Sequence, residues 1–275
     1  MDTLQKITVE KAPSISLLNS IMENMIRIPS GTFMQGSSQL EVEECVFEWK
    51  HRLISQQYTE EVFCSWIKKE YPKHQVNVSA FYISKFLITN KIYSYFLQST
   101  IGVSPPESIG LHSDIDHPVW GVCLENVYEF IEWLNQNDKV VFSLPSESEW
   151  EYAAKGNTEW KYPFGNVFNS NYCNTVEALI NNTTPVGYYS STPSVFGLFD
   201  MAGNVEEWTS SCYKPYPGGM EVKDELYRTL GGNYPILKGG SYCLGGDLSR
   251  CSRRHGPFIG DRFKVIGIRL SAKIK

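Results

Sequence analysis

The chain has 275 residues and a formal net charge of −5, which is enough sequence for one large domain or two small ones around a packed core. The mild acidity and the lack of a long Lys/Arg run argue against a nucleic-acid-binding protein that works through a basic face. The N-terminus MDTLQKITVE is not typical of a secretory signal, and no window approaches the ~18 apolar residues of a membrane span. We therefore expect a cytoplasmic protein with mostly free thiols and no membrane partner.

The first third of the chain predicts short strands interrupted by helices. Residues 25–35 indicate two strands around a Pro-Ser-Gly turn. Residues 39–72 carry apolar side chains at helical spacing, which predicts two helices that end at Pro72. Residues 75–90 alternate as a strand does, and residues 90–99 are a candidate helix.

Two further helices have clear signals in the middle of the chain. Residues 124–135 place apolar side chains on one face, as an amphipathic helix does. Ser146 and Glu149 fit a capping box, in which each side chain accepts a hydrogen bond from the other residue's backbone N–H. Gly156 is a suitable residue to end that helix.

Residues 157–275 contain almost no helix signal. Isolated strand-like runs occur at 185–189, 234–237 and 265–270, separated by Gly, Asn, Pro and Tyr. We expect this region to fold only if short strands, aromatic side chains or a bound ion fix its loops.

The stretch FGLFDMAGNVEEW, residues 196–208, combines a tight turn with Glu206 and Glu207. A hard cation such as calcium binds carboxylate and carbonyl oxygens on a flexible loop, which this stretch offers. The alternative is a plain turn with exposed glutamates. The histidines show no zinc-ligand spacing, and we expect structural roles for them; they are His51, His74, His112, His117 and His255.

The stretch KGGSYCLGGDLSRCSRR, residues 238–254, contains two thiols. Cys243 and Cys251 are candidates for a Cu(I) dithiolate or for disulfide exchange, because paired thiolates suit Cu(I) and nearby arginines lower a thiol pKa. The alternative is that both are small apolar core residues, and that Arg250 and Arg254 fix the loop through carboxylates and carbonyls.

Several stretches together resemble the formylglycine-generating enzyme or sulfatase-modifying-factor family. The resemblance is carried, in order and spacing, by IRIPSGTFMQGS (27–38), FYISKFLITNKIYSYFL (81–97), HPVWGVCLENVYEFIEWLN (117–135), FSLPSESEWEYAAKGN (142–157), YPFGN (162–166), VFGLFDMAGNVEEWTSSCY (195–213), LKGGSY (237–242) and IGIRL (266–270). It divides the chain into an N-terminal extension at 1–24 and a domain at 25–275, with a helical insertion at about 39–72.

The resemblance implies an α+β fold, the formylglycine-generating-enzyme-like variant of the C-type lectin fold, with few helices and short twisted sheets. It also implies a calcium ion held by backbone carbonyls of Gly203 and Val205 and by the Glu207 carboxylate. The region of the family's second calcium site has only Glu177 as a carboxylate here.

The family's oxidases convert a substrate cysteine to formylglycine with Cu(I) held by two cysteines after the G-G-S-aromatic turn. In this chain Cys251 matches a position that is not a copper ligand, and the second ligand falls near Gly246. The family's sulfoxide synthases hold non-heme iron with histidines from a further helical domain, whose histidine motif this chain lacks. The resemblance therefore implies that the family's copper pair is incomplete in this chain, and Cys243 and Cys251 stay the candidate catalytic residues.

Other relatives use the fold for binding, with the loop between G-G-S-aromatic and the final G-x-R as the contact surface. The corresponding segment, residues 243–266, is chemically diverse. Its predicted ligand-binding residues are Asp247, Arg250, Arg254, His255, Phe258, Asp261, Arg262 and Phe263. The first hypothesis is thus a module that binds a protein, a peptide or another ligand, with residues 39–72 as a possible interface. The alternative is a copper or non-heme iron oxidase that acts on a peptide cysteine or a small thiol.

Overall fold

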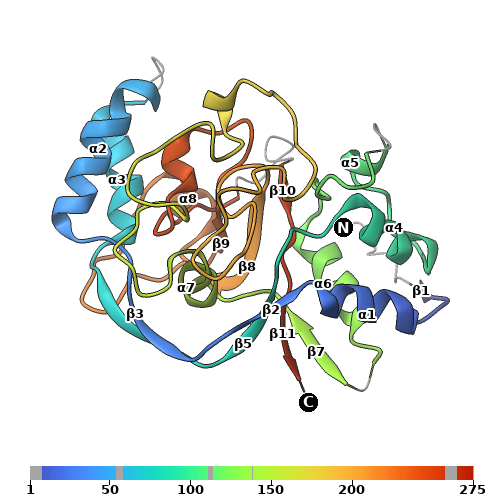
Figure 1. Cartoon of the computed structure of the whole chain (residues 1–275). Coiled ribbons are helices and arrows are strands. Elements are labelled where there is room, and N and C mark those ends of the chain that lie inside the picture. Colours follow the sequence, from blue (N-terminus) through green and yellow to red (C-terminus); the bar gives the residue numbers. More distant parts are fainter. Residues whose placement is uncertain (1–7, 54–57, 111–113, 138, 258–264, 275) are drawn as a thin grey trace.

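The computed structural model describes residues 8–53, 58–110, 114–137, 139–257 and 265–274, and these form a mixed α+β fold (Figure 1). The helices are α1 (Ile15–Glu23), α2 (Gln39–Leu53), α3 (Glu60–Ile67), α4 (Asn90–Gln98), α5 (Glu107–Gly110), α6 (Leu124–Leu134), α7 (Glu147–Lys155) and α8 (Glu225–Leu230). The short helices η1 (Lys68–Glu70), η2 (Val176–Ala178) and η3 (Gly246–Ser249) join them. The strands are β1 (Thr8–Val9), β2 (Met25–Ile28), β3 (Gly31–Gln35), β4 (His74–Val78), β5 (Phe81–Ser84), β6 (Thr100–Ile101), β7 (Val140–Ser143), β8 (Glu206–Cys212), β9 (Pro235–Lys238), β10 (Ile266–Gly267) and β11 (Ser271–Ile274).

The strands form small sheets that tie distant parts of the chain together. A four-stranded antiparallel sheet has the order β2-β5-β11-β7, so the last strand of the chain lies between two earlier ones (Figure 1). A three-stranded sheet has the order β10-β8-β9, in which β10 is parallel to β8 and β9 is antiparallel to it. Two further pairs, β1-β6 and β3-β4, complete the described sheets.

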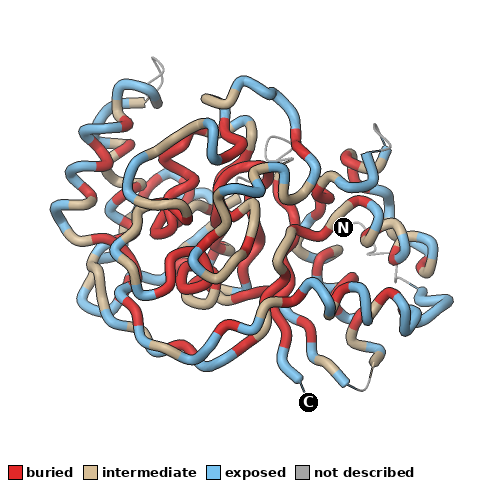
Figure 2. Tube along the Cα trace, in the orientation of Figure 1, coloured by how far each residue is buried: buried red, intermediate tan, exposed pale blue. Residues whose placement is uncertain are grey.

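The buried residues concentrate in the centre of the molecule, around β8, β9 and α7 (Figure 2). One hydrophobic cluster joins α4 and α6 to the four-stranded sheet, and it also contains Leu17 and Ile21 of α1. Helix α1 therefore packs on the same core as the rest of the domain. The predicted boundary between an extension at 1–24 and a domain at 25–275 stays a prediction.

Both helices predicted in residues 39–72 are present, at one end of the molecule (Figure 1). Trp49 of α2 packs in one cluster with Phe63 and Ile67 of α3, and these three side chains are completely buried. Tyr162 from the body of the protein belongs to the same cluster. The two helices thus share their apolar surface with the body instead of projecting from it.

The strongest local signals in the sequence are confirmed. Helices α4 and α6 match the predicted residues, and α7 begins at the predicted capping box: the Glu149 N–H donates to Ser146 Oγ at 3.2 Å, and the Ser146 N–H donates to Glu149 Oε2 at 2.7 Å. The prediction of a strand at 185–189 is wrong, because that segment forms a turn. Helix α8 was not predicted, since six residues hold too few turns to show a periodicity.

Candidate functional site

A cavity of about 380 Å³ lies where the helical insertion meets α8 and the loop that follows β9. The insertion contributes the aromatic side chains of Tyr58 and Trp66, and α8 contributes Leu226. Most of the remaining wall comes from residues 243–255. Binding sites for small ligands commonly have volumes of about 300–1,000 Å³, so this cavity has room for a small organic ligand or one side chain of a peptide.

The glycines of the GGSY turn allow the loop to fold under this cavity. Gly239 and Gly240 have φ angles of 93° and 69°, in the left-handed region that favours glycine. A Cβ atom on Gly240 would lie 3.0 Å from the carbonyl carbon of Leu248 and 3.1 Å from the nitrogen of Ser249. The turn therefore needs glycine, both for its backbone angles and for the close approach of η3.

The structure brings together three of the eight predicted ligand-binding residues. Asp247, Arg254 and His255 line the cavity, and so does Cys243. Arg250 does not line it. The other predicted residues, Phe258, Asp261, Arg262 and Phe263, lie outside the described residues.

The two candidate catalytic thiols lie in different surroundings. Cys243 is exposed at the cavity, and its sulfur lies 3.4 Å from Ser241 Oγ. Cys251 is completely buried in a core cluster with Trp150, Ala153 and Leu198, and it does not line the cavity. Burial raises the pKa of Cys243, and it raises that of Cys251 to about 12, so both thiols are protonated at neutral pH.

Arg250 fixes the insertion to the loop by a buried ion pair. Its Nη2 lies 2.6 Å from Glu70 Oε1, and its Nη1 lies 2.8 Å from Glu70 Oε2. Ser37 and Ser252 also donate to the Glu70 carboxylate, each at 3.0 Å. Burial alone would raise the pKa of Glu70, but the arginine and its hydrogen bonds hold it below the usual range. Arg250 therefore has the structural role that the sequence offered as one alternative.

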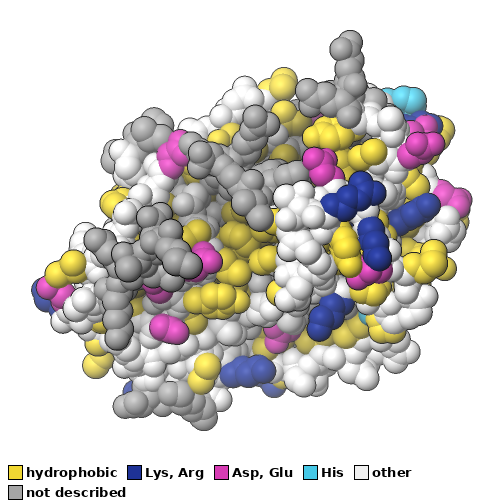
Figure 3. Space-filling model, turned by 180° about the vertical axis from the view of Figure 1, so that it is seen from behind, with side chains coloured by type: hydrophobic (Ala, Val, Ile, Leu, Met, Phe, Trp, Pro, Cys, Tyr) yellow, Lys and Arg dark blue, Asp and Glu magenta, His cyan; other side chains and the backbone are white. Residues whose placement is uncertain are grey.

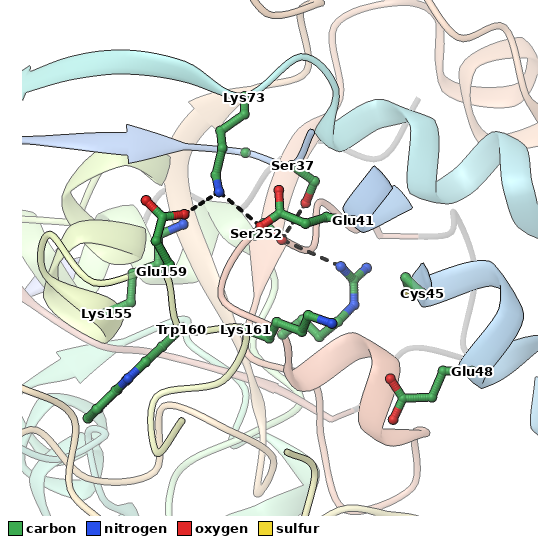
Figure 4. Close-up of a pocket in the computed structure, with 12 residues that line it drawn as sticks. Ser37, Glu41, Cys45, Glu48, Lys73, Lys155, Glu159, Trp160, Lys161 and Ser252 are labelled. Carbon is green, nitrogen blue, oxygen red and sulfur yellow. Dashed lines mark hydrogen bonds and ion pairs between the residues drawn. The ribbon is translucent and has the colours of Figure 1, made fainter. Parts of the chain in front are cut away.

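A second and much smaller cavity lies beside this ion pair (Figure 4). Lys73 reaches between Glu41 and Glu159 at its mouth and pairs with both carboxylates. The cavity measures about 20 Å³, which is room for about one water molecule and too little for an organic ligand. The charged cluster of Figure 4 thus joins α2 to the body of the protein.

The buried basic side chains of the larger cavity already have protein partners. Lys69 Nζ lies 2.5 Å from Asp224 Oδ2, and both side chains are buried. Arg254 Nε lies 2.7 Å from Glu147 Oε1, and its Nη1 donates to the carbonyls of Lys69 and Lys214. These cations hold the walls of the cavity in place.

Sequence reasoning missed the side chains that the insertion and the middle of the chain add to the site. Trp66, Lys69 and Asp224 had no motif to mark them, because they come from segments that only the fold brings together. The sequence marks Glu177 only as the single carboxylate in the region of the family's second calcium site. It lines the cavity and accepts a hydrogen bond from the Gly246 N–H at 3.1 Å.

The carboxylate predicted to bind calcium is engaged by protein groups. Glu207 is completely buried, and Arg269 binds both of its oxygens at 2.8 and 2.9 Å. Trp150 Nε1 donates to Glu207 Oε2 at 2.6 Å. Both oxygens of Glu207 thus have protein donors, and the calcium site of Glu207 with the Gly203 and Val205 carbonyls stays a prediction. The Gly203 N–H donates to the Gly239 carbonyl at 2.7 Å, which ties this loop to the GGSY turn.

The described residues contain no cluster of three His, Cys, Asp or Glu side chains with the geometry to hold a metal ion. Their helices include none that is long and apolar enough to cross a bilayer. On the face turned away from Figure 1, acidic and basic side chains of the described residues lie beside one another (Figure 3).

Comparison with known proteins gives matches along most of the chain. A family model described as sulfatase-modifying factor enzyme 1-like domain matches residues 15–274. Serine/threonine-protein kinase Pkn1 of Chlamydia trachomatis is 29% identical over 230 residues, which cover 76% of this chain and 36% of the kinase. Hercynine oxygenase of Mycobacterium tuberculosis is 27% identical over 245 residues, 76% of this chain and 56% of that protein. Inactive C-alpha-formylglycine-generating enzyme 2 of Mus musculus is 30% identical over 123 residues, which cover 41% of this chain and 38% of that protein. The chain thus spans only about a third of the length of the Pkn1 protein.

Two solved structures share the fold over nearly the whole chain. PvdO from Pseudomonas aeruginosa has a TM-score of 0.66 at 23% identity, and the match covers 90% of this chain and 94% of PvdO. Treponema denticola variable protein 1 has a TM-score of 0.63 at 20% identity, with the same coverage. At these identities the likeness shows the fold alone, and it confirms the predicted variant of the C-type lectin fold.

Proposed function

The chain belongs to the sulfatase-modifying factor enzyme 1-like family, and from that premise we propose that it is a ligand-binding module whose binding site is the 380 Å³ cavity. The observation that carries this proposal is the separation of the two thiols. Cys243 is exposed at the cavity, whereas Cys251 is completely buried among apolar side chains. A Cu(I) dithiolate needs both sulfurs on one ion, and this arrangement gives the cavity one of them.

The surroundings of the cavity support binding as its main task. Its polar groups are held by ion pairs and hydrogen bonds to the protein, and its aromatic and leucine side chains offer apolar contact area. We expect a protein or peptide partner, or a small molecule, to occupy it. Because residues of the helical insertion form one wall, a partner that enters the cavity also contacts the insertion.

The second candidate is a metal-dependent oxidase that acts on a peptide cysteine or a small thiol. It is favoured by the likeness to hercynine oxygenase. It is opposed by the burial of Cys251 and by the raised pKa of both thiols, since the thiolate is the form that binds the metal.

A product assay tests the binding module against a copper oxidase that acts on a peptide cysteine. The protein is incubated in air with copper and a cysteine-containing peptide, and the peptide mass is followed. We expect no peptide aldehyde to form, and only the thiol oxidation that copper and air cause without protein, as in a control with Cys243→Ser. Formation of a peptide aldehyde that requires Cys243 would contradict the binding-module proposal and establish the oxidase.

A further inference from the structure

Two carboxylate oxygens in the wall of the large cavity have neither a hydrogen-bond donor nor an ion-pair partner among the described residues. Asp247 is only 1% exposed, and its Oδ1 has no such partner. Its Oδ2 lies 3.5 Å from Arg253 Nε, at the edge of an ion-pair contact. A buried carboxylate oxygen without a donor is costly, so Asp247 is suited to accept hydrogen bonds from a bound ligand.

Glu177 adds a second acceptor from another element. Its Oε1 accepts from the Gly246 N–H, the residue just before Asp247, so the two carboxylates lie on adjoining parts of the wall. Its Oε2 is buried and has no hydrogen-bond partner among the described residues. Acceptor atoms without a donor in the described part of the chain are therefore buried in the cavity wall, one from η2 and one from η3.

The cavity's buried basic groups lie against protein oxygens, including Arg253 Nε and Arg254 Nε, which make no hydrogen bond with the described residues but lie 3.5 Å from Asp247 Oδ2 and 2.7 Å from Glu147 Oε1. Lys69 is paired with Asp224, and Arg254 is held by Glu147 and by two carbonyls. Arg253 Nη1 donates to the carbonyls of Trp66 and Arg254. An anionic ligand would have to displace these partners, whereas a cationic ligand finds acceptors ready.

The rest of the wall suits an organic cation better than a metal ion. Tyr58 and Trp66 line the cavity with their rings 5.0 Å apart, and aromatic faces attract ammonium and guanidinium groups. Leu226 and Leu244 offer contact for an alkyl chain. Calcium takes six to eight oxygen ligands, and the described part of the chain gathers no third metal-binding side chain beside these two carboxylates.

We propose that the cavity binds an alkylammonium or alkylguanidinium group through Asp247 and Glu177, with its alkyl chain against the aromatic and leucine wall. This inference rests on the proposed function, because it names the class of ligand for the same cavity. A lysine or arginine side chain of a peptide and a free small amine share this chemistry. Burial raises the pKa of Asp247 by more than the neighbouring Arg253 and Arg250 lower it. A bound cation would lower the pKa of Asp247 again.

The test uses Cys243 as a reporter of occupancy. Alkylation of the full chain by iodoacetamide is followed thiol by thiol with mass spectrometry, in the presence of n-butylguanidinium, n-butylammonium, butyrate or n-butanol. We expect the two cations to slow alkylation of Cys243 and to leave the exposed thiols Cys123 and Cys212 unaffected, since neither lines the cavity. A blocked Gly-Arg-Gly peptide that protects at lower concentration than n-butylguanidinium would identify a peptide as the source.

Variants assign the effect to the carboxylates. Asp247→Asn should raise the concentration of cation for half-protection about tenfold or more, because it removes a charge-assisted hydrogen bond in a buried site. Glu177→Gln should act in the same direction from a separate element. Glu225→Gln is the matched control, a cavity carboxylate that is exposed, and we expect less than about a threefold change. Thermal unfolding of each variant verifies that it is folded.

The outcomes separate this inference from the proposed function. Protection by butyrate or butanol without protection by the cations would overturn the cationic ligand and leave a binding module. Equal protection by the cations in Asp247→Asn, Glu177→Gln and the unaltered protein would also overturn it. Copper-dependent aldehyde formation in the product assay would overturn the binding module itself.

Discussion

Replacing Arg250 by alanine is expected to lower the free energy of unfolding by about 3–5 kcal/mol, because it leaves the Glu70 carboxylate buried without its cation. Glu70 is completely buried and Arg250 is 4% exposed. The pair joins η1, at the end of the insertion, to the loop 180 residues further along the chain. Its loss should therefore loosen the insertion as well as the loop.

The effect of Arg250→Ala should depend on pH in a defined direction. In the intact protein the pKa of Glu70 is lowered, so its contribution is present above the unfolded value of about 4.3 and is lost as the pH falls through the folded value. In the variant, burial without the arginine favours the protonated carboxyl. The difference in unfolding free energy should be largest near neutral pH and should narrow in acid.

Urea unfolding at several pH values measures both effects. Lys161→Ala is the control, because Lys161 pairs with Glu44 at 2.7 Å between side chains that are 31% and 46% exposed. An exposed pair of this kind contributes about 0–1 kcal/mol. If Arg250→Ala cost no more than Lys161→Ala, the buried pair would not be what anchors the insertion.

Replacing Arg269 by alanine is expected to cost about 3–5 kcal/mol or more, for a related reason. Arg269 and Glu207 are both completely buried. The guanidinium also donates to the carbonyls of Ser84, Lys85 and Phe199, so the substitution leaves a charge and several carbonyls without their donor. Arg269 thus links Glu207 of β8 to the end of β5 and to the segment before β8.

Thermal unfolding measures the cost of Arg269→Ala, and it also tests the role of Glu207. Thermal unfolding of the unaltered protein should be the same with calcium and with EGTA, because Arg269 and Trp150 already bind the carboxylate. Lys223→Ala is the matched control, an exposed cation 3.6 Å from Glu221, with an expected cost under about 1 kcal/mol. Stabilisation by calcium that disappears in Glu207→Gln would identify Glu207 as a calcium ligand.

Local signals explain how much of the fold could be predicted from the sequence. The capping box at Ser146 and the apolar face of α6 are complete within one segment, and both were found. The six residues of α8 were missed, since the helix is shorter than two turns. Residues 185–189 have strand-like composition but form no ladder, because strand propensity yields to tertiary context.

The candidate site could be predicted only in part, for a physical reason. Asp247, Arg254 and His255 follow the family-like turn in sequence, and they line the cavity as one loop. Trp66 and Glu177 reach the same cavity from segments more than 65 residues before that loop. No pattern in the sequence shows which carboxylate oxygens have a hydrogen-bond donor in the folded protein and which do not.

The central claim is that the cavity is a binding site and not a two-thiol copper centre. Anaerobic Cu(I) titration of the unaltered protein, Cys243→Ser and Cys251→Ser tests it most directly. The account predicts no tight one-to-one site, and weak binding at most that does not depend on Cys251, which is buried away from the cavity. Tight one-to-one binding that is lost in both variants would show that the two sulfurs meet on one ion, and would contradict the account.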